Sequence, residues 1–208
     1  MVDISFVVPM YNADAYLSRT LDSIVKMVGN ETSVSEVILI DDGSVDMTLE
    51  VAQKYVDKYP FFKLISSIHQ GVSATRNLGI DEATGKYVTF IDCDDIFENN
   101  FVKSFRTLSE SMADIIVVDV EITDTMVLKS NLDDKEKISL FKLINRDRGN
   151  NGICSKIFNR NFLLEQGLKF DTDVTVGEDA LFNYQAIDSA GSVAISSQKF
   201  YYVLESHT

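Results

Sequence analysis

The most constraining feature of this sequence is a regular alternation of short β-rich runs with segments of helical periodicity. Residues 4–8 read Ile-Ser-Phe-Val-Val and end at Pro9, and apolar residues then recur at helical spacing between Leu17 and Val28. The same order repeats in the segments 36–59 and 62–85, followed by a fourth strand at 87–91. Strands that alternate with helices of roughly 10–15 residues form βαβ crossovers. The pattern therefore predicts an α/β fold with a mostly parallel sheet flanked by helices, an architecture that commonly binds nucleotides.

The pattern becomes less regular beyond residue 98. We expect a helix near 99–111, a strand at 114–120, a helix near 134–144 and a β-rich stretch at 192–204. The chain contains no internal repeat and no low-complexity linker, and its 208 residues suffice for one large domain. We therefore predict a single domain, 1–208, with a nucleotide-binding half at 1–97 and a less regular half at 98–208.

The charge balance argues against nucleic acid as a partner. The chain has 19 basic and 32 acidic residues, a net charge of −13, which repels a polyanion. A phosphate-containing substrate would therefore need a local source of positive charge, either a metal ion or a few placed Lys and Arg side chains.

The sequence also bears on cellular location. No apolar stretch is long enough to span a bilayer, and residues 1–3 lack the basic start of a signal peptide, so we expect a soluble, cytoplasmic protein. The two cysteines, Cys93 and Cys154, and the two histidines, His69 and His207, do not form zinc-ligand spacings. We therefore expect reduced thiols and ordinary histidines.

Acidic residues gather directly after two of the predicted strands. Asp41 and Asp42 follow the second strand, and the run D-C-D-D at 92–95 follows the fourth. Ligands of parallel α/β sheets bind outside the carboxyl ends of the strands. Side chains at positions i and i+2 of an extended segment point to the same side, so Asp92 and Asp94 can present their carboxylates together. Because Mg²⁺ and Mn²⁺ take oxygen ligands and complete their shells with substrate phosphates and water, the sequence predicts a divalent-metal site there.

Five short motifs occur in a consistent order, each close to a predicted strand end. They are V-V-P-M-Y-N at 7–12, D-D-G-S-V-D-M-T at 41–48, G-V-S-A-T-R-N-L-G at 71–79, F-I-D-C-D-D at 90–95 and G-E-D-A-L-F at 177–182. Together they resemble family 2 glycosyltransferases of the GT-A fold, which is Rossmann-like, over residues 4 to 202. The resemblance implies inverting transfer of a sugar from a nucleoside-diphosphate sugar to an acceptor hydroxyl, in bacterial polysaccharide or glycoconjugate synthesis. It also implies that 98–208 is the acceptor-binding half.

The resemblance assigns the nucleotide to the first three motifs. It implies that Pro9, Tyr11 and one carboxylate of the pair Asp41 and Asp42 hold the base, and we favour Asp42 within that pair. An aromatic ring that stacks on a pyrimidine and a carboxylate that accepts its ring N–H suit uracil, so a UDP-sugar is the favoured donor. Arg76 would contact the base or the diphosphate.

The last two motifs would hold the metal and the catalytic base. By resemblance, Asp92 contacts the ribose or the metal, Asp94 is the metal ligand and Asp95 is the alternative ligand, with Mn²⁺ or Mg²⁺ as the cofactor. Glu178 and Asp179 match the acidic pair that contains the base. Their positions on a helix do not separate the two acids, and the resemblance favours Asp179.

A locally basic stretch interrupts the acidic composition of the second half. Its basic residues are Lys142, Arg146, Arg148, Lys156 and Arg160, and Asp147 is the acid among them. We predict that this stretch, including Lys156, binds a saccharide or lipid-linked acceptor with an anionic group, such as a diphosphate, or makes peripheral contact with the inner face of an anionic membrane. Scattered solvated charges are the alternative.

The carboxyl-terminal residues depart from the family pattern. Family members often carry Arg shortly after an aromatic pair such as Tyr201 and Tyr202, whereas Val203 and Leu204 stand there in this sequence. We therefore expect no diphosphate contact from that strand. His207 is a candidate for a late metal or phosphate contact, with a solvated terminal histidine as the alternative.

Other functional classes fit the motifs less well. A receiver-type signalling module should carry its acidic pair after the first strand, and a sugar nucleotidyltransferase should have a Gly-rich loop with Arg near the amino terminus; this sequence has neither. A glycosidase with two carboxylates, a non-catalytic nucleotide- or sugar-binding protein and, despite the missing loop, a sugar nucleotidyltransferase stay open as alternatives.

Overall fold

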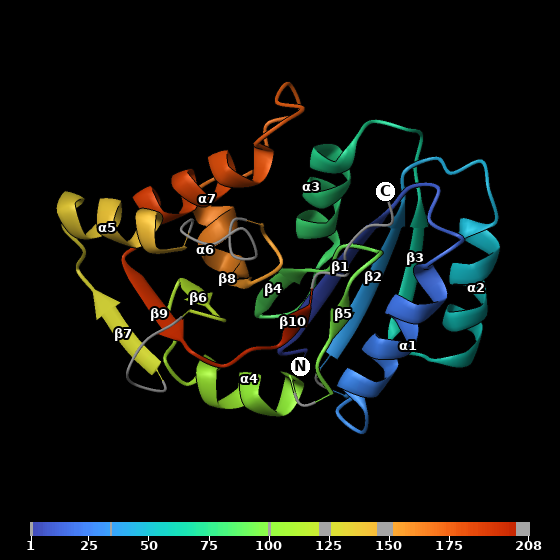
Figure 1. The fold of residues 1–208 in the computed structure, drawn as a ribbon, viewed down its shortest axis with the longest axis horizontal. Helices are drawn as coiled ribbons and strands as arrows, with labels where there is room; N and C mark the ends of the chain where they lie inside the picture. Colours follow the sequence, from blue (N-terminus) through green and yellow to red (C-terminus); the bar gives the residue numbers. More distant parts are fainter. Residues whose placement is uncertain (1, 34, 100, 121–125, 145–151, 203–208) are drawn as a thin grey trace.

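One large sheet organises the molecule (Figure 1). The computed structural model describes residues 2–33, 35–99, 101–120, 126–144 and 152–202, and within them eight strands form this sheet in the order β3-β2-β1-β4-β8-β6-β9-β7. A separate two-stranded ribbon pairs β5 (Ile96–Phe97) with β10 (Tyr201–Tyr202) in antiparallel fashion.

The first half of the chain builds the parallel part of the sheet. Its strands are β1 (Ile4–Met10), β2 (Ser35–Asp41), β3 (Phe62–Ser66) and β4 (Tyr87–Phe90), and their pairings are all parallel. The crossover helices are α1 (Leu17–Val28), α2 (Thr48–Lys58) and α3 (Val72–Glu82). Every residue of β1 is buried, as expected of a central parallel strand that is covered on both faces. These elements confirm the βαβ alternation predicted from the sequence.

The second half extends the same sheet with mixed pairings. Its strands are β6 (Ile115–Val117), β7 (Met126–Ser130), β8 (Lys156–Asn159) and β9 (Ser192–Ser196), and its helices are α4 (Phe101–Ser109), α5 (Asp134–Ile144), α6 (Arg160–Glu165) and α7 (Glu178–Ser189). β8 runs antiparallel to both β4 and β6, β9 is parallel to β6, and β7 is antiparallel to β9. All strands of the described sheet except β7 and β8 therefore share one direction, which confirms the mostly parallel α/β fold.

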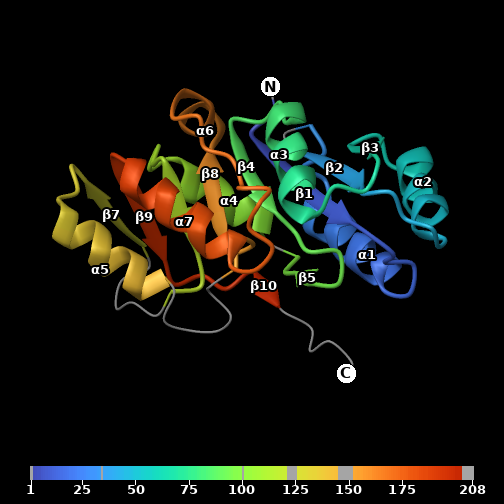
Figure 2. The ribbon, with the colours of Figure 1, turned by 90° about the horizontal axis from the view of Figure 1, so that it is seen from above.

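The helices form layers on both sides of this sheet. α3 and α7 lie on one side, and α1 and α4 lie on the other, where α1 packs against α2 and α4 (Figure 1). Seen from above (Figure 2), the sheet extends from β3 beside α2 at one end to β7 beside α5 at the other. The predicted halves 1–97 and 98–208 thus meet within one sheet, at the neighbouring strands β4 and β8.

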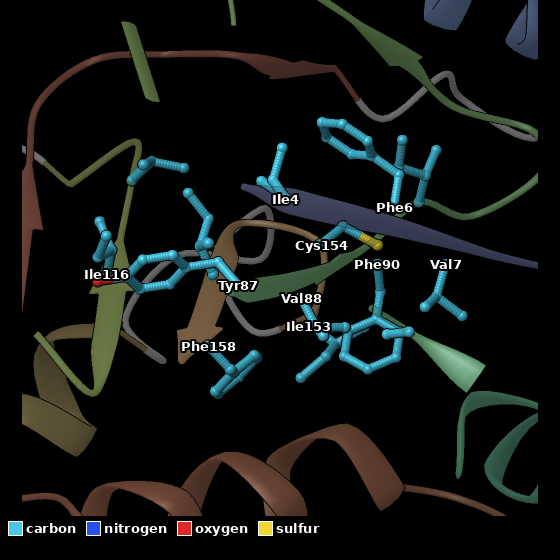
Figure 3. Packing of buried hydrophobic residues seen from close by; sticks show 14 of the residues in the cluster. Ile4, Phe6, Val7, Tyr87, Val88, Phe90, Ile116, Ile153, Cys154 and Phe158 are labelled. Atoms are coloured by element: carbon cyan, nitrogen blue, oxygen red, sulfur yellow. The ribbon is translucent and has the colours of Figure 1, made fainter. Parts of the chain in front are cut away.

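The hydrophobic core crosses this junction without a break (Figure 3). Val88 of β4 is paired with Phe158 of β8, and the rings of Phe90 and Phe158 lie edge to face with centroids 6.4 Å apart. Phe158 in turn contacts Phe182 of α7, which stacks on Phe170 at 4.0 Å between centroids. The buried aromatic chain therefore anchors α7, which begins with Glu178 and Asp179, to the centre of the sheet.

Element boundaries in the second half differ from the sequence-based expectation. The strand expected at 114–120 is confined to Ile115–Val117, although Val118 and Val120 are also buried. The β-rich stretch expected at 192–204 divides into β9 and β10, which belong to different sheets, while residues 203 and 204 lie outside the described part. Apolar runs in this half are buried by irregular backbone as well as by strands, so hydrophobicity alone misplaces the strand ends.

Candidate active site

A cleft opens at the carboxyl end of the parallel strands. It has a volume of about 310 Å³ and gathers the segments that follow β1, β2, β3 and β4 with the first turn of α3. Its lining consists of Pro9, Met10, Tyr11, Tyr16, Asp42, His69, Gly71, Val72, Thr75, Asp92, Cys93 and Asp94. Five residues predicted for nucleotide or metal binding, Pro9, Tyr11, Asp42, Asp92 and Asp94, therefore share one cavity, at the position expected for a parallel α/β sheet.

Asp42, rather than Asp41, faces this cleft. The carboxylate of Asp42 accepts hydrogen bonds from the backbone N–H groups of Gln70 (2.8 Å) and Gly71 (2.9 Å), which fix its orientation. Asp41 is buried at the end of β2, where its carboxylate accepts the N–H of Ser44 at 3.2 Å. The two neighbouring acids therefore have separate surroundings, and Asp42, although only 4% exposed, is the one that lines the cleft.

His69 is a cleft residue that the sequence interpretation treated as ordinary. Its ring stacks on that of Tyr11, with centroids 4.3 Å apart and planes inclined by 20°. Its Nδ1 lies 2.8 Å from Oδ2 of Asp42, a distance at which the tautomer with a proton on Nδ1 donates a hydrogen bond to the carboxylate. The rule that singled out Asp41 and Asp42, a position just after a strand, also applies to His69, because β3 ends at Ser66.

Arg76 lies behind the cleft and joins acids from different segments. Its guanidinium is buried, with the residue 4% exposed, and Nη2 donates to Oδ1 of Asp92 at 3.1 Å. Nη1 donates to Oδ1 of Asp179 at 2.6 Å and lies 3.4 Å from Oε1 of Glu178. Burial by itself would lower the pKa of Arg76, but Asp179 and Asp92 outweigh it and leave that pKa raised. Arg76 is therefore neither solvated nor part of the cleft lining, and its hydrogen bonds described above go to carboxylates.

Close packing of α3 on the sheet sets the position of Arg76. A Cβ atom on Gly79, one turn further along the helix, would clash with the side chain of Val7. Glycine at this position lets α3 approach β1 closely, and the guanidinium then reaches across the ring of Phe170 at 5.3 Å from its centroid.

Asp179 is held from two directions at the start of α7. Gly177 precedes the helix in a left-handed conformation with φ of 85°, which glycine adopts readily. Oδ1 of Asp179 accepts from Arg76, and Oδ2 accepts the backbone N–H of Ile153 at 3.1 Å. Burial raises the pKa of Asp179, an effect that Arg76 opposes and that the nearby Asp92 and Glu178 reinforce. The side chain is still 21% exposed, so a hydroxyl group can reach it.

Glu178 has a looser environment than Asp179. Its side chain is 18% exposed, and its Oε1 lies 3.4 Å from Nη1 of Arg76. Neither Glu178 nor Asp179 lines the cleft described above. Both contact Nη1 of Arg76, and Nη2 of Arg76 donates to the cleft residue Asp92.

The carboxylates after β4 fit a divalent metal whose shell is completed by a substrate. Asp92 and Asp94 line the cleft, whereas Asp95 is buried and does not. Burial raises the pKa of the Cys93 thiol to about 12. Among the described residues no three His, Cys, Asp or Glu side chains are grouped to hold a metal. The donor set matches Mg²⁺ or Mn²⁺, which commonly use one or two carboxylates together with phosphate oxygens.

Lys156, predicted to face an anionic acceptor or a membrane, is instead buried. It is 1% exposed, and its Nζ donates to the carbonyl oxygen of Gly152 at 2.6 Å. Burial lowers the pKa of Lys156 to about 8. The expected basic surface is therefore not continuous, because β8 carries Lys156 into the sheet between β4 and β6.

The other basic residues of this stretch do not converge within the described structure. Arg160 donates to the carbonyl oxygen of Asp81, and Lys142 lines a separate cavity between α5 and α7. Arg146 and Arg148 lie outside the described residues, as does His207. None of the described helices combines the length and apolar character needed to cross a membrane.

Comparison with known proteins places this geometry in a family context. The model of the family described as "Glycosyl transferase family 2" matches residues 5–165. The cholesterol galactosyltransferase of Borreliella burgdorferi is 41% identical over 101 residues, which make up 48% of this chain and 27% of that protein. The poly(ribitol-phosphate) beta-N-acetylglucosaminyltransferase TarS of Staphylococcus aureus is 26% identical over 204 residues, 97% of this chain and 35% of TarS. This chain thus spans about a third or less of the length of these two relatives.

Solved structures give the same fold. The crystal structure of S. aureus TarS 1-349 in complex with UDP-GlcNAc matches with a TM-score of 0.84 at 22% identity, covering 100% of this chain and 60% of that one. The complex of the same fragment with UDP gives a TM-score of 0.82 at 23% identity, covering 97% of this chain and 60% of that one. This likeness confirms the GT-A type of α/β fold.

Proposed function

Because the chain belongs to glycosyl transferase family 2, we propose that it transfers a sugar from a UDP-sugar to an acceptor hydroxyl with inversion at the anomeric carbon. The observation that carries the proposal is the link through Arg76 between Asp92 in the cleft and Asp179 beside it. Arg76 thereby holds Asp92, on the donor side, and Asp179, the candidate general base, in fixed positions relative to each other. The TarS structures with UDP and UDP-GlcNAc, which share the fold, support a UDP-sugar as donor.

In this proposal the uracil base binds between Pro9, Tyr11, Asp42 and His69. Tyr11 is exposed and offers a ring face for stacking. A carboxylate has about four lone-pair sites, so Asp42 can accept the uracil N–H in addition to the two backbone N–H groups that orient it. His69 covers one face of the Tyr11 ring and contacts the carboxylate of Asp42.

The diphosphate would bind beside Asp92 and Asp94. These two carboxylates would hold Mn²⁺ or Mg²⁺, with Asp95, which is buried and does not line the cleft, as the alternative ligand. When bound, the ion would neutralise the negative charge that develops on the departing UDP. In a chain of net charge −13, this local positive charge also makes a diphosphate site electrostatically feasible.

The chemical step would use Asp179 as general base. It takes the proton of the acceptor hydroxyl while the acceptor oxygen bonds to the anomeric carbon and the bond from that carbon to the UDP oxygen breaks. Both oxygens of Asp179 already accept one hydrogen bond, which orients the carboxylate and leaves further lone pairs for the acceptor. Because its pKa is raised, Asp179 is a stronger base than an ordinary aspartate. Glu178 would hydrogen-bond the acceptor.

For the acceptor we propose only a broad class of molecule. We place it in bacterial polysaccharide or glycoconjugate synthesis, with a saccharide or a lipid-linked molecule as acceptor. The named relatives support this breadth, since one is called a cholesterol galactosyltransferase and another acts on poly(ribitol-phosphate). A cytoplasmic location with peripheral contact at the inner membrane face is part of the proposal. With Lys156 buried, such contact would have to involve other basic residues.

A donor screen tests the function without a known acceptor. The protein is heated with a panel of nucleotide-sugars in the presence and absence of Mn²⁺, and a ligand at about 100 times its Kd should stabilise the fold by about 2.7 kcal/mol. We expect UDP-sugars with Mn²⁺ to raise Tm and to release UDP when candidate acceptors are added. Stabilisation without UDP release from any donor and acceptor pair would favour a binding protein, and no stabilisation would refute the proposal.

A further inference from the structure

Lys156 and Asp179 contact opposite ends of the same peptide group. The Nζ of Lys156 donates to the carbonyl oxygen of Gly152 at 2.6 Å, and the next N–H, that of Ile153, donates to Oδ2 of Asp179 at 3.1 Å. The carbonyl of Gly152 and the N–H of Ile153 are joined by one C–N bond and lie in one plane. A cation at one end and a carboxylate at the other therefore align with the dipole of this peptide.

This arrangement is held inside the protein. Ile153 is fully buried and lies near Phe90 in the core (Figure 3), and Lys156 is 1% exposed at the start of β8. A Cβ atom on Gly152 would lie 3.8 Å from Oδ2 of Asp179, so the loop passes close to the carboxylate. Burying an ammonium group is unfavourable unless its donors are satisfied, and a methionine of similar length would fill the space without this penalty. The retained charge therefore calls for a role other than packing.

We propose that Lys156 is a positioning residue for Asp179, acting through the Gly152–Ile153 peptide. Its ammonium anchors the carbonyl oxygen of Gly152 and polarises the peptide. This directs and strengthens the hydrogen bond that the N–H group of Ile153 donates to the carboxylate of Asp179. Lys156 does not touch the substrate. The proposal rests on the proposed function of Asp179 as general base.

Four charged groups surround the carboxylate of Asp179. Arg76 approaches from α3, Asp92 from the segment after β4, Glu178 from α7 and Lys156 from β8. The bond from Ile153 lowers the pKa of Asp179, against the effect of burial. Removing the Lys156 ammonium weakens that bond and removes a nearby positive charge, and both changes favour the protonated carboxyl. The pKa of Asp179 should therefore rise.

The first test replaces Lys156 with Met, Gln and Arg and measures steady-state kinetics over pH. For Lys156→Met we expect kcat to fall by about 10- to 100-fold, the loss typical of a misplaced catalytic group, with UDP affinity unchanged. The acidic limb of kcat/KM should move to higher pH. Lys156→Arg should restore part of kcat, because it keeps a cation at the carbonyl. Lys63→Met, an exposed lysine of β3 paired with Glu82, is the matched control and should change neither quantity.

A second measurement does not depend on turnover. The carboxyl carbon of Asp179 is titrated by NMR in the wild type and in Lys156→Gln, which is shorter, neutral and still a donor, so that folding is retained if Met is not tolerated. A higher pKa in the variant supports the positioning role. An unchanged pKa, or kinetics of Lys156→Met like those of the wild type, would overturn it. If no donor is turned over by the wild type, the proposed function fails, while the titration still decides whether Lys156 acts on Asp179.

Discussion

Nη1 of Arg76 and Oδ1 of Asp179 lie 2.6 Å apart, although 103 positions separate the two residues in the sequence. The other terminal nitrogen of the same guanidinium holds Asp92. One buried cation therefore compensates acids from two segments that would otherwise repel each other. This contact ties α3 to α7 and makes the base candidate part of the same charged cluster as the cleft.

Removing this cation should destabilise the fold. In Arg76→Gln the partly exposed acids Asp92, Glu178 and Asp179 lose their buried cationic partner, and the free energy of unfolding should fall by about 1–3 kcal/mol. Arg76→Lys should lower the free energy of unfolding by less, because an ammonium keeps the positive charge although it lacks the forked geometry of a guanidinium. Denaturant unfolding measures both. Arg106→Gln breaks the exposed pair with Glu31 and should change stability by about 0–1 kcal/mol. Equal losses at the two arginines would contradict the buried-cluster interpretation.

The base subsite can be tested with UDP alone. Asp42→Asn should weaken UDP binding by roughly tenfold or more, because the lost charge-assisted bond contributes about 1.5–3 kcal/mol. His69→Phe keeps the ring on Tyr11 but not the contact with Asp42, and His69→Ala removes both. Calorimetry should therefore rank His69→Phe between the wild type and His69→Ala. If Asp41→Asn has a larger effect on affinity than Asp42→Asn, the assignment of the cleft-facing acid is wrong.

Metal dependence should be a property of Asp94. We expect UDP to bind the wild type more tightly with Mn²⁺ than without it, and we expect Asp94→Asn to remove most of this difference by removing an anionic oxygen ligand. Isothermal titration with and without the ion gives both affinities for each protein. Asp57→Asn changes an exposed acid on α2 and serves as the control. Equal UDP affinity with and without metal in the wild type would refute the metal site.

If Asp179 is the general base, its replacement should lower kcat, and its pKa should appear in the pH profile of the activity. Asp179→Asn should lower kcat by about 10²–10⁴-fold with nearly unchanged donor affinity, and Glu178→Gln should lower it less. Because the pKa of Asp179 is raised, its carboxyl is protonated up to a higher pH than an ordinary aspartate. Activity should therefore increase with pH through a value above the usual aspartate range. An inactive Glu178→Gln beside an active Asp179→Asn would reverse the assignment, and loss of donor binding in either would place the pair on the donor.

The buried lysine predicts a stability profile of its own. The folded state lowers the pKa of Lys156 to about 8 from 10.5, so between these values the unfolded chain holds a proton that the folded chain has released. The free energy of unfolding of the wild type should therefore increase over this pH range relative to Lys156→Met. Urea titrations of both proteins at pH 7 and pH 9.5 measure the difference. A difference that is independent of pH would show that Lys156 has an ordinary pKa in the folded state.

The strands and helices of the first half follow from local sequence. The β-rich run at 4–8 and the helical spacing from Leu17 to Val28 correspond to β1 and α1 because each segment's pattern of burial is set by its own period. The same reasoning placed acids directly after β2 and β4. Because the carboxyl ends of parallel strands share one edge of the sheet, these acids lie at the same edge. In the second half the sequence analysis joined β9 and β10 in one stretch, because the partner of each strand is set by tertiary contacts: β9 pairs with β6 in the large sheet, and β10 pairs with β5.

Sequence alone determined the α/β class, the family resemblance and the strand-end acids, because these depend on residue type and short spacing. Tertiary structure gave the two acids of each pair different surroundings: Asp42 lines the cleft and Asp41 does not, and Asp179 lies closer to Arg76 than Glu178 does. It also moved Lys156 from an expected surface to the interior. Neighbouring residues of the same type have nearly the same local sequence, so their burial, partners and pKa values are set by contacts with distant segments such as Gln70 and Ile153.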